Sequence, residues 1–278
     1  MQMKQLSLVL LLFTMFGIHF TISAQGDLLV SPMRVVFDSK KQKEELNLVN
    51  IGKDTAMYSV SFLQYNMTED GSFIIIDKPD SGQYFAEPYL RYFPRTVTLA
   101  PRESQTIRIQ WRKTSDMPEG EFRSHLYFRA EKNVKPLGME QSKKDSNQLS
   151  VSLTPIYGIS IPTIIRNGDF KVSASLSDLK ISTTDDTIPE LRLTIHRSGK
   201  ISVYGDLYVD YVSPSGKSTQ IGYTRGIAVY TNISKRNCAL KLHPGKDVNF
   251  KAGKLKVKYT SSKDVPYVLY AEQELGIN

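Results

Sequence analysis

The side chains most often used for catalysis or metal binding are few and scattered in this chain of 278 residues. No HExxH, CxxC or GxSxG motif and no glycine-rich phosphate loop is present. No histidine lies at metal-ligand spacing from another, and His125, inside a strand-like run, is expected to be structural. The four histidines are His19, His125, His196 and His243. We therefore predict no catalytic residue, no metal site, no cofactor and no enzyme activity.

One cation stands out from its surroundings. Arg34 lies inside the apolar, β-rich run Leu28–Phe37, in which Pro32 marks a strand edge or a crossover between sheets. The side chain of Arg34 either points outward into solvent or lies in a groove, where its planar guanidinium would bind a carboxylate. The residues alone leave both readings open.

Apolar and polar residues alternate strictly in the stretch 148–162. Its odd positions are mostly apolar and its even positions are mostly small or polar, which indicates a strand with one apolar face. The apolar positions are Leu149, Val151, Leu153, Tyr157, Ile159 and Ile161. The polar segment 132–147 before it is expected to be a long loop.

The rest of the chain consists of short β-rich runs separated by turns. About seven runs in residues 25–166 predict an immunoglobulin-like sandwich, and the pattern restarts after a hinge at 166–169. Residues 167–278 are therefore expected to form a second β-sandwich. The runs before the hinge are 28–37, 46–50, 56–65, 73–76, 95–99, 105–111 and 121–130; those after it are 170–174, 191–195, 202–212, 221–231, 239–242, 255–259 and 267–271.

The first residues are typical of an export signal. Lys4 precedes the apolar run Leu6–Phe16, and Ala24 offers a small residue at the cleavage point. We expect residues 1–24 to be removed, the alternative being a retained membrane anchor, for which the run is short. No later stretch predicts a membrane span. The single cysteine, Cys238, excludes an intrachain disulfide and is expected in the core.

The net charge is +8, and several lysine clusters contribute to it. Such clusters either attract an acidic surface or guard strand edges against aggregation, and we favour the second reading. No recognition-helix pattern is present, so a nucleic-acid partner is not expected.

Several short runs of the first sandwich follow one another in a characteristic order and spacing: Ser31–Phe37, Leu48–Lys53, Tyr92–Arg95, Leu99–Pro101, Ser104–Arg108, Glu119–Leu126 and the alternating strand from Leu149. In this order and spacing they resemble the periplasmic pilus-assembly chaperones of the chaperone–usher type, the PapD-like family. The resemblance covers the first sandwich; the second agrees only in length and β character.

The resemblance implies two immunoglobulin-like domains in an L and a periplasmic chaperone for pilus or fimbrial subunits. Such a chaperone lends a strand to an incomplete subunit and delivers it to an outer-membrane usher. The lent side chains would be Leu149, Val151 and Leu153, and Arg34 would anchor the C-terminal carboxylate of the subunit. The lysine that assists this arginine in the family falls on Gly158 here. Arg34 would therefore bind the carboxylate alone, or with help from Arg166 or from backbone N–H groups.

Two further expectations follow. An unoccupied chaperone would expose the apolar lent strand, which leads to shielding by the loop 132–147 or to self-association. The alternative function is an exported two-domain immunoglobulin-like structural or adhesion protein without a client, in which Leu149, Val151 and Leu153 would face its own core.

Overall fold

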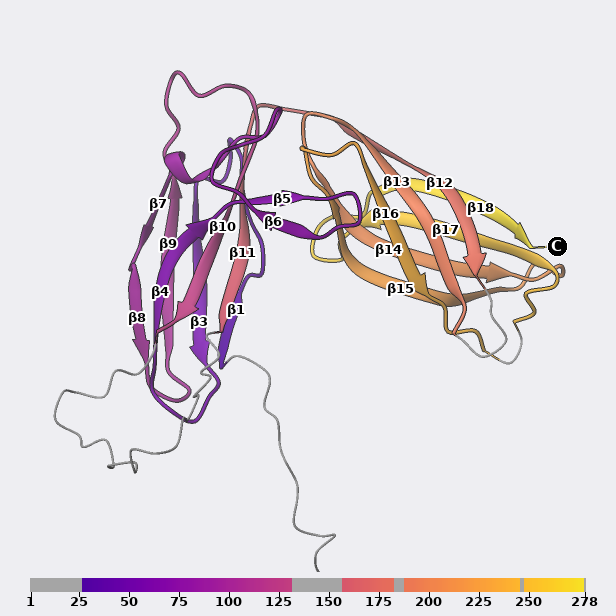
Figure 1. Ribbon diagram of the computed structural model, residues 1–278, viewed down its shortest axis with the longest axis horizontal. Coiled ribbons are helices and arrows are strands. Elements are labelled where there is room, and N and C mark those ends of the chain that lie inside the picture. The colour runs from indigo at the N-terminus through magenta and orange to yellow at the C-terminus, as the bar shows by residue number, and fades with distance from the viewer. Residues whose placement is uncertain (1–26, 132–156, 183–187, 246–247, 278) are drawn as a thin grey trace, which may run out of the picture.

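The computed structural model describes residues 27–131, 157–182, 188–245 and 248–277. Two β-sandwiches lie at an angle to one another, as the arms of an L (Figure 1). In these ranges all regular structure is strand except one short 3-10 helix, η1 (Glu87–Tyr89). None of the helical residues in them is part of a helix that could cross a membrane. The prediction of an all-β fold with two sandwiches is confirmed.

The first sandwich consists of two sheets that face one another. The strand order is β1-β3-β9-β7 in one sheet and β2-β11-β10-β4-β8 in the other. The bounds are β1 Leu28–Ser31, β2 Val35–Phe37, β3 Lys43–Asn50, β4 Ala56–Leu63, β7 Leu90–Phe93, β8 Thr96–Leu99, β9 Ser104–Trp111, β10 Gly120–Ala130 and β11 Gly158–Asn167.

The chain crosses between these sheets at Pro32, as expected. Strand β1 pairs antiparallel with β3, whereas β2 pairs parallel with β11 in the opposite sheet. A proline has no N–H to offer a ladder, so it suits the point at which one pairing ends and the next begins. Arg34 follows two residues later and directly precedes β2.

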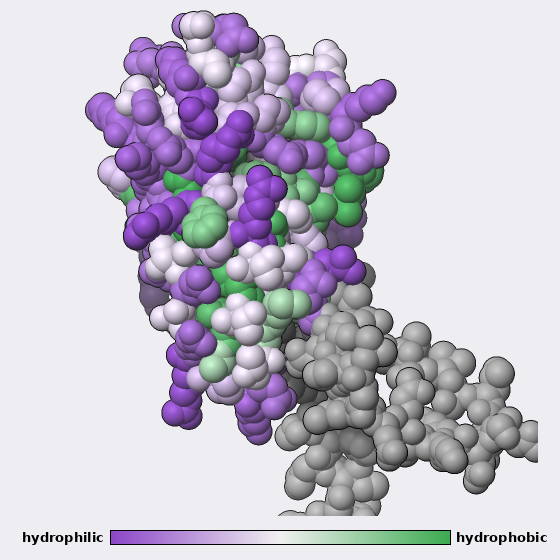
Figure 2. All heavy atoms as spheres, turned by 90° about the vertical axis from the view of Figure 1, so that its left-hand side faces the viewer, coloured by the Kyte–Doolittle hydropathy of each residue, from purple (hydrophilic) through white to green (hydrophobic). Residues whose placement is uncertain are grey.

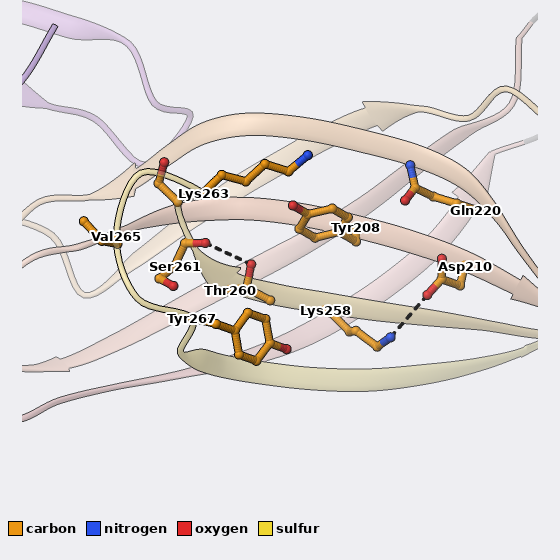
Figure 3. A pocket seen from close by; sticks show the side chains of 10 residues that line it. Tyr208, Asp210, Gln220, Lys258, Thr260, Ser261, Lys263, Val265 and Tyr267 are labelled. Atoms are coloured by element: carbon orange, nitrogen blue, oxygen red, sulfur yellow. Dashed lines mark hydrogen bonds and ion pairs between the residues drawn. The ribbon is translucent and has the colours of Figure 1, made fainter. Parts of the chain in front are cut away.

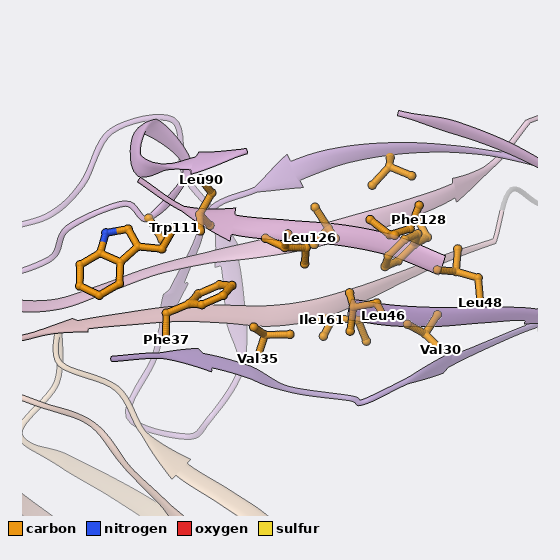
Figure 4. Packing of buried hydrophobic residues seen from close by; sticks show 14 of the residues in the cluster. Val30, Val35, Phe37, Leu46, Leu48, Leu90, Trp111, Leu126, Phe128 and Ile161 are labelled. Atoms are coloured by element: carbon orange, nitrogen blue, oxygen red, sulfur yellow. The ribbon is translucent and has the colours of Figure 1, made fainter. Parts of the chain in front are cut away.

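The core of the first sandwich is built by alternate residues of the facing strands (Figure 4). In β11, Ile161 and Ile165 are fully buried in this core, while Ser160 and Pro162 face the other way and are only partly buried. Trp111 and Phe37 add the largest buried side chains. The face of this sandwich shown in Figure 2 is mainly hydrophilic, with apolar side chains in separate small areas.

The second sandwich has its own core, which begins with Val172 and ends with Ile277. Its sheets have the strand orders β12-β13-β16 and β15-β14-β17-β18. The bounds are β12 Val172–Ser182, β13 Glu190–Gly199, β14 Val203–Val212, β15 Ser218–Val229, β16 Lys235–Lys241, β17 Gly253–Ser261 and β18 Leu269–Ile277. Cys238 is partly buried against this core, and burial raises the pKa of its thiol.

One predicted strand is divided. The run expected at 56–65 ends at Leu63, and β5 (Tyr65–Met67) pairs with β6 (Phe73–Ile75) as a separate hairpin. Figure 1 shows this hairpin reaching from the first sandwich to the second. Met67 of this hairpin is buried against Ala228 and Tyr230 of the second sandwich. The apolar contacts of the hairpin are therefore made with the other sandwich.

Some predictions concern residues outside the described ranges. The signal segment 1–24, the loop 132–147 and the lent side chains Leu149, Val151 and Leu153 all lie there. The described part of the alternating strand is β11, which continues it from Gly158.

Candidate functional site

Arg34 lies at the junction of the two sandwiches. Its guanidinium carbon is 4.3 Å from the centre of the Tyr204 ring, which belongs to β14 of the second sandwich. Burial and the nearby Arg123 guanidinium lower the pKa of Arg34 to about 10 despite the attraction of Glu121. Arg34 therefore stays protonated at neutral pH, in a place where its charge is poorly solvated.

A second arginine is buried beside it. Arg123 is 5% exposed, and one of its nitrogens, Nη2, donates to Glu121 Oε1 at 2.6 Å and to Ser202 Oγ at 2.7 Å. Its guanidinium carbon lies 3.7 Å from the centre of the Tyr230 ring. Burial alone would lower the pKa of Arg123, but Tyr230 and Glu121 outweigh burial and raise it.

Glu121 is the acid that holds this group together. Its Oε2 accepts hydrogen bonds from Ser202 N at 3.0 Å and Ser202 Oγ at 2.9 Å, and from Arg166 Nε at 3.3 Å. Burial opposes ionisation, yet Arg123, Arg166 and Ser202 together lower the pKa of Glu121 to about 2. The carboxylate is thus ionised at neutral pH and joins both sandwiches.

The charges of this group do not balance. We call Arg34, Glu121, Arg123 and Arg166 the cleft cluster; it contains three guanidinium groups and one carboxylate. Within the described ranges, Nε and Nη1 of Arg123 are buried without a hydrogen-bond partner. Buried donors and charges without partners are costly, so the cluster is suited to accept an anion, above all a carboxylate.

His125 borders the cluster but adds no charge to it. Its Nε2 lies 3.2 Å from Tyr230 Oη, and burial, helped by Arg123 and Arg34, lowers the pKa of His125 to about 3. No group of acids, histidines or cysteines that could hold a metal ion occurs among the described residues. His125 is therefore uncharged at neutral pH and only borders the cluster.

The structure explains the glycine at the position where the resemblance places a lysine. A Cβ on Gly158 would lie 2.3 Å from Oη and 2.4 Å from Cε2 of Tyr127, so the ring of Tyr127 occupies the place of a side chain. The parallel register pairs Val35 with Thr163, which places Arg34 near Pro162 and four residues away from the level of Gly158. The second cation beside Arg34 is Arg123, on the neighbouring strand β10.

The strand that continues the alternating stretch has a free edge. Strand β11 pairs with β10 along its whole length, but β2 covers its other edge only at Thr163–Ile165. In the part of the chain that the structure describes, no strand covers that edge from Gly158 to Pro162. This open edge runs from Gly158 toward the level of Arg34 and the cleft cluster.

A groove of about 450 Å³ lies elsewhere, on the outer face of the second sandwich (Figure 3). Its acid, Asp210, accepts a hydrogen bond from Lys258 at 3.3 Å, and its other lining residues are mainly tyrosines and hydroxyl side chains. The one acid among its lining residues is thus already paired with a lysine.

Comparisons with known proteins give distant structural likenesses. No protein-family model matches the chain, and no curated protein matches its sequence. The YadV chaperone is 14% identical, with 90% of this chain and 99% of that chain covered and a TM-score of 0.45. The CupB2 chaperone of Pseudomonas aeruginosa is 10% identical, with 90% and 100% covered and a TM-score of 0.45.

A third likeness is to the CsuC–CsuE chaperone–tip adhesion subunit pre-assembly complex from the archaic chaperone–usher Csu pili of Acinetobacter baumannii. It is 12% identical, with 88% of this chain and 98% of that chain covered and a TM-score of 0.44. Likenesses at this level assign no function, so the proposal below is argued from the residues of this chain.

The sequence indicates Arg34, with Arg166 as a helper, but the prediction missed Arg123 and Glu121. Arg123 alternates with Phe122 and Ser124 in an ordinary strand pattern, which does not by itself show that a second sandwich covers that face. The available signal was the row Glu121, Arg123 and His125, three titratable side chains at every second position and hence on one face.

Proposed function

We propose that this protein is an assembly chaperone that binds pilus or fimbrial subunits in the periplasm. It lends a subunit the strand that carries Leu149, Val151 and Leu153 and holds the C-terminal carboxylate of that subunit at Arg34. The observation that carries the proposal is the cleft cluster, a buried group with excess positive charge at the end of an open strand edge.

The cluster suits a carboxylate for geometric reasons. Arg34 lies over the Tyr204 ring and makes no hydrogen bond to the described residues, so its N–H groups are available for two parallel hydrogen bonds. Nε and Nη1 of Arg123 lie nearby and lack partners within the described ranges. We propose that Arg34 and Arg123 share the anion, so that Arg123 takes the role that the related family gives to a lysine.

The lent strand supplies most of the affinity in this proposal. Burying each large aliphatic side chain contributes up to roughly 1.5–3 kcal/mol, whereas each main-chain hydrogen bond contributes about 0.5–1.5 kcal/mol net. Three such side chains therefore outweigh the ladder, which sets the register instead. The carboxylate at the cleft cluster then fixes where along the strand the subunit stops.

Two finer statements belong to the same proposal. Removal of the signal segment 1–24 releases the chain into the periplasm, and the chaperone passes its subunit to an outer-membrane usher. Both are supported by the apolar run after Lys4 and by the resemblance of the first sandwich to the chaperone–usher family.

The test is capture of the client from the native envelope fraction. The tagged chain, Val151→Asp, Arg34→Ala and the control Ile51→Asp are compared, with bound proteins identified by mass; Ile51 is 55% exposed and lies away from the cleft. We expect the parent and Ile51→Asp to hold a small β-rich exported protein, Val151→Asp to lose it and Arg34→Ala to hold less.

Other outcomes contradict the proposal. If no variant and no parent sample holds a partner, the chain is an exported structural or adhesion module without a client. If the parent and Val151→Asp hold the same partner equally, the binding surface is not the lent strand.

A further inference from the structure

Strand β6 carries three consecutive bulky apolar side chains that are open to solvent. Phe73, Ile74 and Ile75 are 50%, 55% and 61% exposed. Proteins usually protect a strand edge with charges, proline or a covering loop, since a bare apolar edge pairs with other chains. The edge of β6 has none of these within its own three residues.

The backbone of β6 shows which of its edges is free. Ile76 N donates to Gln64 O at 3.0 Å, and Thr68 N donates to Ser72 O at 3.0 Å. In an antiparallel ladder every second residue exchanges both bonds with its partner, so Ile74 faces β5. The N–H and C=O groups of Phe73 and Ile75 therefore point away from β5, and no described residue bonds to them.

The opposite edge of the hairpin is already occupied. On β5, Tyr65 O accepts a hydrogen bond from Gln83 Nε2 at 2.9 Å, and Met67 O accepts one from Asn232 Nδ2 at 2.8 Å. The hairpin is therefore held by both sandwiches along its β5 edge, and the backbone groups of its β6 edge remain available for pairing. The Phe73 ring also lies 5.5 Å from the Tyr230 ring, which fixes the free edge in place.

We propose that this edge pairs with the same edge of a second copy of the chain, antiparallel, about a two-fold axis through Ile74. In that register, Phe73 faces Ile75 of the second copy, and both residues point their backbone groups outward, as a hydrogen-bonded pair requires. Ile74 faces its own equivalent across the axis. The edge is thus complementary to itself in its hydrogen bonds as well as in its apolar side chains.

The free edge of β6 is only three residues long. A short strand buries little area, so the dimer is expected to be weak and to depend on concentration. The inference does not require a client and does not involve the lent strand.

The test is the oligomeric state of the full mature chain by sedimentation equilibrium, over about 1 µM to 1 mM, the range in which weak association is measurable. We expect a monomer–dimer equilibrium in the parent. Ile74→Lys should weaken it about tenfold or more, because two like charges then face one another across the axis. Ile51→Lys, at an equally exposed apolar position away from β6, should leave it unchanged.

Mixing two variants tests the axis itself. Ile74→Glu alone should also be monomeric, but an equimolar mixture with Ile74→Lys should form a heterodimer, because residue 74 meets only residue 74 of the other copy. Ile74 is exposed, so the circular dichroism spectrum and melting temperature of each variant should match those of the parent.

Three results would overturn the proposal: a parent that stays monomeric throughout the range, a dimer unaffected by Ile74→Lys, and failure of the mixture to associate. A dimer that Val151→Asp dissolves while Ile74→Lys leaves it intact would assign self-association to the lent strand instead.

Discussion

The cleft cluster and the outer sheet of the second sandwich use positive charge in opposite ways. On that sheet, three exposed or partly exposed lysines each have an acid on a neighbouring strand: Lys254 with Glu274 at 2.8 Å, Lys256 with Glu272 at 2.8 Å and Lys258 with Asp210 at 3.3 Å. In the cleft cluster, three arginines share one buried carboxylate.

This difference shows why net charge is a poor guide to function here. The lysine row contributes to the charge of +8, but its cations are paired and in contact with water, so it contributes little to stability and attracts no particular ligand. The cluster has the same number of cations, but they are largely withdrawn from water and share one carboxylate. Burial and imbalance of charge, rather than the number of charges, make the cleft cluster the candidate binding site.

The largest effect expected from this contrast is on stability. Glu121→Gln leaves three guanidinium groups at the cleft without their acid and should lower the free energy of unfolding by about 3–5 kcal/mol, as for other broken buried ion pairs. Urea denaturation followed by tyrosine and tryptophan fluorescence measures this loss.

The matched control is Glu274→Gln, which breaks an exposed pair of the lysine row and should leave the unfolding midpoint within error of the parent. Equal midpoints for the two variants would mean that removing the acid of the cleft cluster costs no more stability than removing an acid of the surface lysine row.

The Arg34→Ala variant tests whether the cleft cluster, unlike the surface lysine row, binds a ligand. It removes a charged hydrogen-bonding partner and should weaken affinity for the captured client about tenfold to a hundredfold by calorimetry. A client lacking its terminal carboxylate should bind the parent and Arg34→Ala equally. Arg225→Ala, which changes an exposed arginine of β15, should have no effect; a loss as large as that of Arg34→Ala would indicate general electrostatic attraction.

The Gly158→Lys variant tests whether the second cation beside Arg34 can come from β11 instead of from Arg123 on β10. The new side chain meets the Tyr127 ring, so the variant should lose about 1–3 kcal/mol of stability, as is usual for overpacking, and gain no affinity. Tyr127→Ala in the same chain should restore most of the stability. A gain in client affinity from Gly158→Lys alone would contradict the assignment of Arg123.

The smallest expected effect is on the pH dependence of stability. The folded pKa of His125 is about 3, below the ordinary value of 6.5, so the unfolded chain binds a proton first and the folded state loses stability as the pH falls from about 6.5 toward 3. Glu121, with a folded pKa of about 2 against 4.5, adds a loss below about pH 4.5. In the His125→Gln variant, the melting temperature should therefore change less between about pH 7 and 5 than it does in the parent. His196→Gln, the control, should keep the slope of the parent.

The sequence allowed the fold class to be predicted, because alternation along each strand reports which face is apolar. It also singled out Arg34, a charge inside an apolar run, and Pro32, where the chain changes sheets. It could not show that Arg123 is buried, since the residues that cover it, Ser202 and Tyr230, come from the other sandwich. Contacts between domains leave no periodic signal in either partner.

The hairpin shows the same limit. The sequence predicts its turn at Asp70-Gly71 and its second strand at 73–76, but the expected run 56–65 includes only the first residue of β5 and places the hairpin in the first sandwich alone. What separates it from that sandwich is the burial of Met67 against the second, a match of two surfaces far apart in sequence. The lent side chains Leu149, Val151 and Leu153 stay a prediction, as does the anchoring role of Arg34.

Because of the β5–β6 hairpin, the two sandwiches take up their relative orientation during folding rather than when a ligand binds. The sandwiches are joined by the chain between β11 and β12 and, separately, by the hairpin, where Asn237 N donates to Glu69 O at 2.7 Å and Lys235 pairs with Glu69 at 3.3 Å. Two attachment points restrict the rotation that one covalent connection would permit. The entropy of aligning Arg34 with Tyr204 is thus lost during folding, and a ligand that arrives later meets a preorganised receptor.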